Sequence, residues 1–205
     1  MSGFGKEIKA LERKVKSILS TKRFEHTLGV CSMAGILADY CLPEDKDEII
    51  AAALLHDVAK ELSTETLIAM INEEGIALNS ADAPPILHSY AAPHVIKSEF
   101  PEFATQNILS AVFNHTVGSV DMTVFDEIIF LADYIEEGRT YKDCIETRKF
   151  MLLSLVKDNA EENVNALHKA CVMAMQRTCD SLLRKGAAVN PKTLDSIKAL
   201  TIKIH

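Results

Sequence analysis

The sequence has no uninterrupted apolar run that approaches the roughly 18 residues of a membrane-spanning helix, so we expect no membrane partner. Its N-terminal residues also lack the apolar stretch that is typical of a signal peptide. The five cysteines include no Cys-x-x-Cys pair, which argues against a zinc knot, and their odd number argues against a disulfide framework. These absences favour reduced thiols and a cytoplasmic localisation.

The sequence has fewer basic than acidic residues, with 22 Lys and Arg, 29 Asp and Glu, and a formal net charge of −7. A protein that binds nucleic acid usually carries a basic face, so we expect no nucleic-acid partner. A phosphorylated small substrate would need a metal ion or a local basic cluster to offset the negative field. The hydrophobic content of 48% is ordinary for a globular protein, and 205 residues suffice for one domain with a sizeable core.

Strand-like alternation is scarce, whereas apolar residues recur at helical spacing along almost the whole chain. The pattern predicts helices over residues 6–19, 22–40, 43–59, 64–71, 87–98, 102–114, 122–137, 143–155 and 157–184, then a short helix after Pro191. Ser63 is a candidate N-cap, and residues 75–85 carry the Gly, Asn and Pro of a loop. We therefore predict an all-α fold in which residues 1–205 form a single helical domain.

His56 and Asp57 follow a nearly continuous apolar helix, in the segment AAALLHDVAK. An ionised Asp57 beside this helix would be costly unless a metal ion or another partner compensated it. The dipeptide alone is weak evidence, because a His-Asp pair often arises by chance and could simply end a helix that faces solvent.

Three further polar residues share helical stripes with apolar ones. His26 lies on a stripe with Val30, Asp133 lies on one with Ile129, and His115 ends a third helix. Each alone is more often a satisfied core residue, but together they place ligand-type side chains at the buried ends of several helices. A helical bundle can converge such groups on one ion, and imidazole with carboxylate suits iron, manganese or zinc. Such an ion would activate water and screen phosphate charge, as hydrolysis of a phosphoanhydride requires.

The order His26, His56-Asp57, Asp133 resembles the HD superfamily of metal-dependent phosphohydrolases. The segments RFEHTLGV, AALLHDVAK, HTVG and LADYIEEGR are more closely similar to the YqeK-type family of symmetrical bis(5'-nucleosyl)-tetraphosphatases, and the resemblance covers about residues 20–191. It implies an all-α HD domain with a divalent transition metal, iron foremost and manganese or another divalent ion next. It also implies that a metal-activated water splits diadenosine tetraphosphate (Ap4A) symmetrically into two ADP.

The resemblance also implies roles for individual residues. The metal ligands would be His26, His56, Asp57 and Asp133, and the catalytic residues would be Asp57 and Lys60. The residues in contact with the phosphates of the nucleotide would be Arg23, Lys60, His88, His115, Thr116 and Arg139. The stretch that lies against the nucleoside would be Lys185, Gly186 and Ala187.

Several alternatives stay open at this point. The same motifs would serve an HD-type nucleotidase, a guanosine polyphosphate hydrolase, or a nucleotide-sensing module without catalysis, and a homodimer is not excluded. His88 and His115 could complete a second metal site with Asp57, although we favour phosphate contact. We interpret Glu136 and Glu137 as solvated acids at a helix end.

Overall fold

The computed structural model describes residues 7–205, so Lys6, where the first predicted helix begins, lies outside the described residues. The described residues fold into α-helices and two short 3-10 helices, with no strand among them, which confirms the all-α prediction. The elements are α1 Ile8–Ile18, α2 Thr21–Cys41, η2 Pro43–Asp45, α3 Lys46–Leu55, α4 Thr64–Glu73, α5 Pro84–Glu99, η3 Pro101–Phe103, α6 Gln106–Asn114, α7 Val124–Ile135, α8 Lys142–Leu153, α9 Ala160–Arg184 and α10 Pro191–Lys203. Within residues 7–205, no helix is long and apolar enough to cross a membrane.

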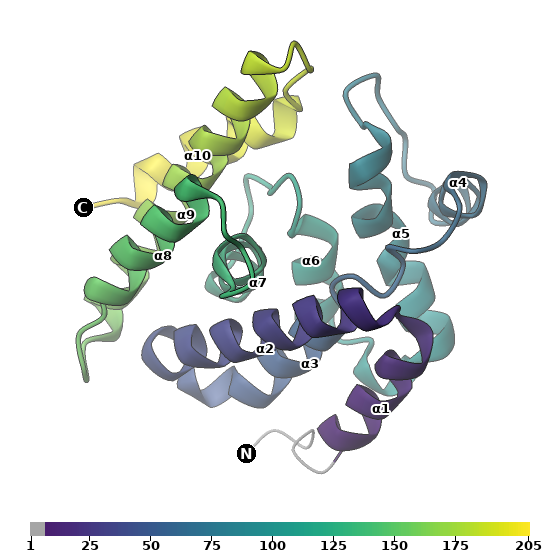
Figure 1. Cartoon of the computed structure of the whole chain (residues 1–205), viewed down its shortest axis with the longest axis horizontal. Helices are drawn as coiled ribbons and strands as arrows, with labels where there is room; N and C mark the ends of the chain where they lie inside the picture. Colours follow the sequence, from purple (N-terminus) through teal and green to yellow (C-terminus); the bar gives the residue numbers. More distant parts are fainter. Residues whose placement is uncertain (1–6) are drawn as a thin grey trace.

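Helix α7 lies at the centre of the fold and packs against α2, α6 and α9 (Figure 1). Its residues from Phe125 to Ala132 are buried, as expected for a helix with neighbours on several sides. Thr123 begins the helix with a capping box: its hydroxyl accepts from Asp126 N, and the Asp126 carboxylate accepts from Thr123 N. This cap holds the helix whose last turn carries Asp133.

The predicted helix over residues 43–59 is divided. Pro43 begins the short η2, α3 follows, and the regular helix ends at Leu55, directly before His56. The next amides bond three residues back, Val58 N to Leu55 O and Lys60 N to Asp57 O, so the backbone turns tightly here. The early end leaves His56 and Asp57 directly after the buried half of this helix, which runs from Ala51 to Leu55.

The other helices agree with the predicted pattern to within a few residues at each end. Ser63 caps α4 as predicted, because its hydroxyl accepts from Thr66 N. Helix α5 begins three residues earlier than predicted, at Pro84, which suits the first turn of a helix. The last helix, α10, has 13 residues and is not short.

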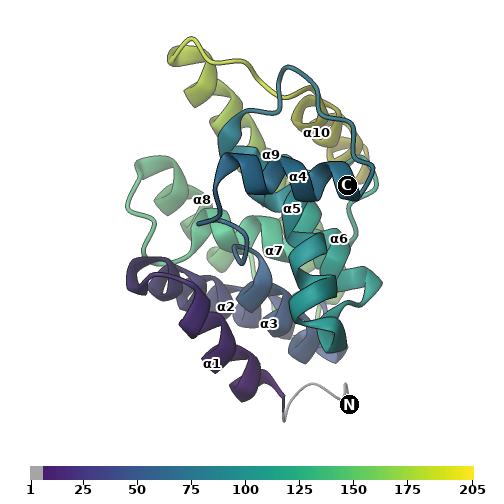
Figure 2. The same ribbon diagram turned by 90° about the vertical axis from the view of Figure 1, so that its right-hand side faces the viewer.

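The helices surround α7 on several sides, with α8, α9 and α10 on one side, α4 and α5 on the other, and α2 and α3 below (Figures 1 and 2). Buried apolar side chains from Leu11 in α1 to Leu200 in α10 form one continuous core. That residues 1–205 form a single domain stays a prediction.

Candidate active site

The four predicted metal ligands come from three different helices and converge in space. His26 lies in α2, His56 and Asp57 follow α3, and Asp133 lies in the last turn of α7. His26 Nε2 lies 2.9 Å from Asp133 Oδ1, and His56 Nε2 lies 3.5 Å from Asp57 Oδ2. The ligating atoms of His26, His56 and Asp133 all lie within 4.8 Å of one another, a spacing that one ion could bridge. Their role as metal ligands stays a prediction.

The hydrogen bonds of the histidines suit a metal ion. His26 Nδ1 lies 3.2 Å from Glu136 Oε1, and His56 Nδ1 lies 2.8 Å from Ala53 O. Carboxylate and carbonyl oxygens only accept, so both Nδ1 atoms donate, and in the neutral form of each ring Nε2 carries a lone pair. Among the described residues, these two Nε2 atoms are buried without a hydrogen-bond partner, although His26 Nε2 lies 2.9 Å from Asp133 Oδ1. Buried nitrogen lone pairs that face carboxylates are what a divalent cation would satisfy.

A second group of ligand-type atoms lies on the other side of Asp57. Its Oδ1 lies 3.1 Å from His88 Nε2 and 3.8 Å from His115 Nε2, while Oδ2 faces His26 and His56. The ligating atoms of Asp57, His88 and His115 also lie within 4.8 Å of one another. Asp57 therefore joins two groups, each of which could hold an ion.

Electrostatics keeps the carboxylates ionised. Burial opposes the charge of Asp57, but the imidazoles of His56 and His115 outweigh burial and hold the pKa of Asp57 well below its usual range. Burial likewise opposes the charge of Asp133, yet His26 and the Arg139 guanidinium lower its pKa. Both side chains are thus anionic at neutral pH.

For two of the basic groups, the cost of burying a charge is not outweighed and lowers the pKa. It lowers the pKa of His88 to about 4, so this imidazole is neutral near pH 7. It also lowers the pKa of Lys60, whose Nζ lies 3.2 Å from both ring nitrogens of His88 and 4.0 Å from Asp57 Oδ1.

Two guanidinium groups lie beside the carboxylates. Arg23 Nη1 lies 2.8 Å from Asp57 Oδ2, and Arg139 Nη2 lies 2.5 Å from Asp133 Oδ1. About a third of each arginine side chain remains exposed, 31% for Arg23 and 35% for Arg139. Each therefore has N–H groups that can reach an anionic ligand from solvent.

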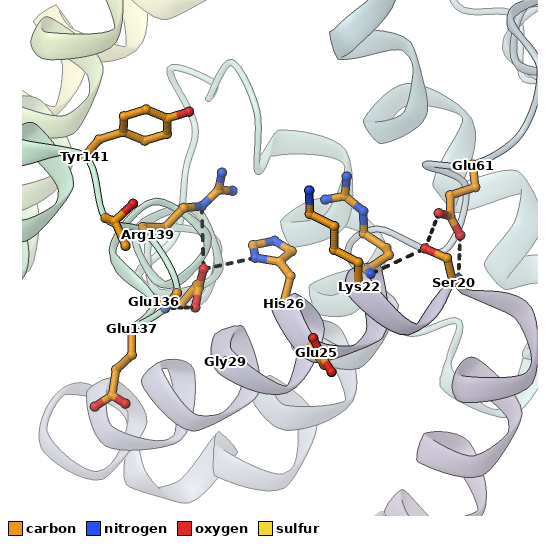
Figure 3. A pocket seen from close by; sticks show the side chains of 13 residues that line it. Ser20, Lys22, Glu25, His26, Gly29, Glu61, Glu136, Glu137, Arg139 and Tyr141 are labelled. Atoms are coloured by element: carbon orange, nitrogen blue, oxygen red, sulfur yellow. Dashed lines mark hydrogen bonds and ion pairs between the residues drawn. The ribbon is translucent and has the colours of Figure 1, made fainter.

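A pocket of about 780 Å³ opens beside the cluster (Figure 3). Its wall contains His26, Arg23 and Arg139, and the loop after α7 forms one side. Glu61 accepts from the backbone and hydroxyl of Ser20 and so joins the start of α2 to the turn after α3. The pocket is large enough for part of a nucleotide and lies against two of the predicted phosphate contacts.

Arg148 holds the loop on the far side of the pocket. It lies in α8 and donates to the backbone carbonyls of Ile135, Glu136 and Arg139, which follow the end of α7. A cation at the C-terminus of a helix satisfies carbonyls that lack helical partners. No sequence motif marked this residue.

The remaining predicted substrate residues divide into two places. The Thr116 hydroxyl lies 2.8 Å from Ser89 Oγ. Thr116 follows His115 in sequence and Ser89 follows His88, so this contact lies beside the group of Asp57, His88 and His115. Lys185, Gly186 and Ala187 lie in the exposed turn between α9 and α10 and are not among the residues that line the pocket. Their contact with a nucleoside stays a prediction.

The interpretation of Glu136 as a solvated acid is wrong, whereas Glu137 is exposed as expected. Only 4% of Glu136 is accessible, because its side chain turns back onto α2 and meets His26. Its position three residues after Asp133 was the available signal, since residues at this spacing share a helical face.

The segment that carries this cluster of histidine and aspartate matches a known family. The family model of the HD domain matches residues 23–138, which are more than half of the chain. The chain therefore belongs to the HD domain family.

Two bacterial relatives extend the similarity over nearly the whole chain. The chain is 31% identical to "Bis(5'-nucleosyl)-tetraphosphatase, symmetrical" of Bacillus subtilis strain 168, over 87% of this chain and 89% of the relative. It is 30% identical to the protein of the same name from Halalkalibacterium halodurans, over 92% and 94%. These findings confirm the resemblance inferred from the motifs.

A solved structure shares the fold. It is the crystal structure of a predicted HD superfamily hydrolase involved in NAD metabolism from Clostridium acetobutylicum, with a TM-score of 0.81 and 29% identity. The match covers 95% of this chain and 97% of that one, so the fold extends beyond the HD segment into α8–α10.

Proposed function

We propose that this protein is a metal-dependent hydrolase that splits Ap4A symmetrically into two ADP. The observation that carries the proposal is the cluster of His26, His56, Asp57 and Asp133 beside a pocket with two exposed guanidinium groups. The names of the relatives support the substrate class, because two proteins similar over most of their length are symmetrical bis(5'-nucleosyl)-tetraphosphatases.

The metal site has two imidazole and two carboxylate ligands, a set that suits iron foremost and manganese next. When bound, the ion lowers the pKa of water and offsets the negative charge of phosphate. Asp57 orients the reacting groups, since its two oxygens face both sides of the cluster. Lys60, next to Asp57, places an ammonium group where phosphate charge develops.

The phosphate chain is held by the cations that line the pocket. Arg23 keeps its contact with Asp57 and Arg139 keeps those with Asp133 and Glu136, and both use their exposed N–H groups to bind a two-phosphate unit. With this unit at the cluster, the far half of the dinucleotide extends toward solvent, and the bond that breaks is the central one. ADP keeps every contact of the retained half, so it should act as a product inhibitor.

His88 and His115 contact phosphate oxygens in this proposal. The alternative is a second ion held by these two histidines and Asp57. We favour phosphate, because the Lys60 ammonium lies 3.2 Å from His88 and would repel a second cation.

The proposal is tested by incubating the purified protein with a panel of dinucleoside polyphosphates, mononucleotides and guanosine polyphosphates, and separating the products by ion exchange. ADP as the main product from Ap4A supports it. Rapid release of phosphate from mononucleotides alone would favour a nucleotidase, and cleavage of guanosine polyphosphates alone would favour that class of hydrolase. Binding without any cleavage would favour a nucleotide-sensing module.

A further inference from the structure

Glu136 is a buried carboxylate beside the site that no sequence motif assigned. Its Oε1 lies 3.2 Å from His26 Nδ1, on the side of the ring away from the cluster (Figure 3). We infer that Glu136 is a positioning residue for the metal centre, which fixes the ring orientation and the tautomer of His26. The inference rests on the proposed metal site and adds one residue that supports a predicted ligand.

The other histidines explain why His26 needs this partner. His56 and His115 directly follow the ends of α3 and α6, and their Nδ1 atoms donate to the carbonyls of Ala53 and Val112, three residues back. Carbonyls in the last turn of a helix lack helical partners and are free to accept. His26 lies inside α2, where the nearby carbonyls accept helical amides. Its acceptor must therefore come from another element, and Glu136 provides it from the end of α7.

Two glycines make room for the carboxylate. Gly29 lies one turn after His26 on α2, and a Cβ atom at this position would collide with Glu136 Oε2. A Cβ at Gly138 would lie 2.9 Å from the same oxygen, and the Gly138 amide donates to it. Glycine within a helix is unfavourable in itself, so its presence at position 29 is accounted for by the close approach of Glu136.

The chemistry of such a pair is general. A carboxylate that accepts from one ring nitrogen holds the imidazole in place and makes the other nitrogen a better ligand. Here it leaves Nε2 of His26 with its lone pair directed toward Asp133, 2.9 Å away. Loss of such a partner typically weakens metal binding about 10–100-fold, although every ligand remains.

The test measures the affinity of the metal-free protein for Mn²⁺ by the EPR signal of the free ion, without any substrate. Glu136→Gln keeps the size of the side chain but removes its charge, and we expect about 10-fold weaker binding; Glu136→Ala should approach 100-fold. Gly29→Ala changes no polar group, yet should weaken binding about 10-fold by displacing Glu136. Gly35→Ala is the matched control on the same helix: its Cβ meets the flexible ends of Ile50, at 3.3 Å, and of Lys46, at 3.8 Å, and affinity should not change.

A second readout needs no metal. In the metal-free wild type, nitrogen NMR should find the proton of neutral His26 on Nδ1, and Glu136→Ala should shift it toward Nε2. Circular dichroism and thermal melting verify that each variant folds. If Gly29→Ala does not fold, the two Glu136 variants decide.

Folded Glu136 variants with wild-type affinity for Mn²⁺ and an unchanged His26 tautomer would overturn the inference and leave the proposed function intact. A wild type that binds no Mn²⁺ would overturn the metal centre and the inference together.

Discussion

Asp57 Oδ1 lies 3.1 Å from His88 Nε2, and this contact joins the predicted metal ligands to a second pair of histidines. Because burial lowers the pKa of His88 to about 4, the ring is neutral at pH 7 and can donate one hydrogen bond from Nε2.

His88→Ala tests what this contact does. We expect kcat/KM for Ap4A to fall about 10-fold or more, since one hydrogen bond to a charged oxygen is lost, while metal content by elemental analysis stays unchanged. Loss of one metal equivalent in this variant would instead establish a two-ion centre.

Removal of a predicted ligand should abolish both metal binding and activity. Asp57→Ala and Asp133→Ala each remove an ionised oxygen from the cluster, so we expect activity to fall more than about 100-fold together with the metal content. Elemental analysis and the rate of ADP formation measure the two effects. Asp195→Ala, at an exposed position on α10, is the control and should resemble the wild type. Variants at Asp57 or Asp133 that keep both metal and activity would disprove the ligand assignment.

Arg23 should bind the retained half of the substrate. Because 31% of its side chain faces solvent at the pocket, Arg23→Ala should raise the KM for Ap4A about 10-fold and weaken inhibition by ADP to a similar extent. Initial rates with and without added ADP give both values. Lys198→Ala removes an exposed cation from α10 and should change neither. An unchanged KM in Arg23→Ala would show that phosphate is held elsewhere.

Buried thiols should make the protein less stable at alkaline pH. Burial raises the pKa of Cys31 and of Cys41 to about 12, whereas an unfolded chain loses these protons near pH 9. Above pH 9 the folded state therefore binds more protons than the unfolded state, and its stability falls by about 1.4 kcal/mol per pH unit for each thiol.

Urea unfolding from pH 8 to 10.5 measures this slope. Because lysines and tyrosines titrate in the same range, the readout is the difference between the wild type and Cys31→Ala, which should lose stability less steeply. Parallel slopes for the two proteins would contradict the raised pKa of the Cys31 thiol.

The parts of the site that the sequence predicted are those encoded locally. The apolar run before His56 predicted a buried helix, and an ionised Asp57 beside it required a compensating group, so both residues were candidates from their own segment, whereas their roles came from the resemblance of the motifs. Glu136 was missed despite its spacing of three residues from Asp133, because the polar sequence around it resembles a solvated helix end. Its burial depends on the space beside Gly29, which lies more than 100 residues away in sequence.

Long-range packing also explains why Arg148 was not identified from the sequence. Arg148 binds the end of α7 only because α8 folds back onto it, and no local pattern indicates that return. The turn that carries Lys185 is not among the residues that line the pocket, and its contact with a nucleoside stays a prediction.

The most direct test of the account is hydrolysis of Ap4A in oxygen-18 water, followed by mass spectrometry of the products. Attack on an internal phosphate with ADP as the leaving group breaks the central anhydride, so the account predicts ADP alone, with one oxygen-18 atom in the terminal phosphate of half of the ADP molecules. AMP and ATP as the main products would contradict symmetrical cleavage, and no cleavage of Ap4A by the metal-loaded protein would contradict the proposed activity itself.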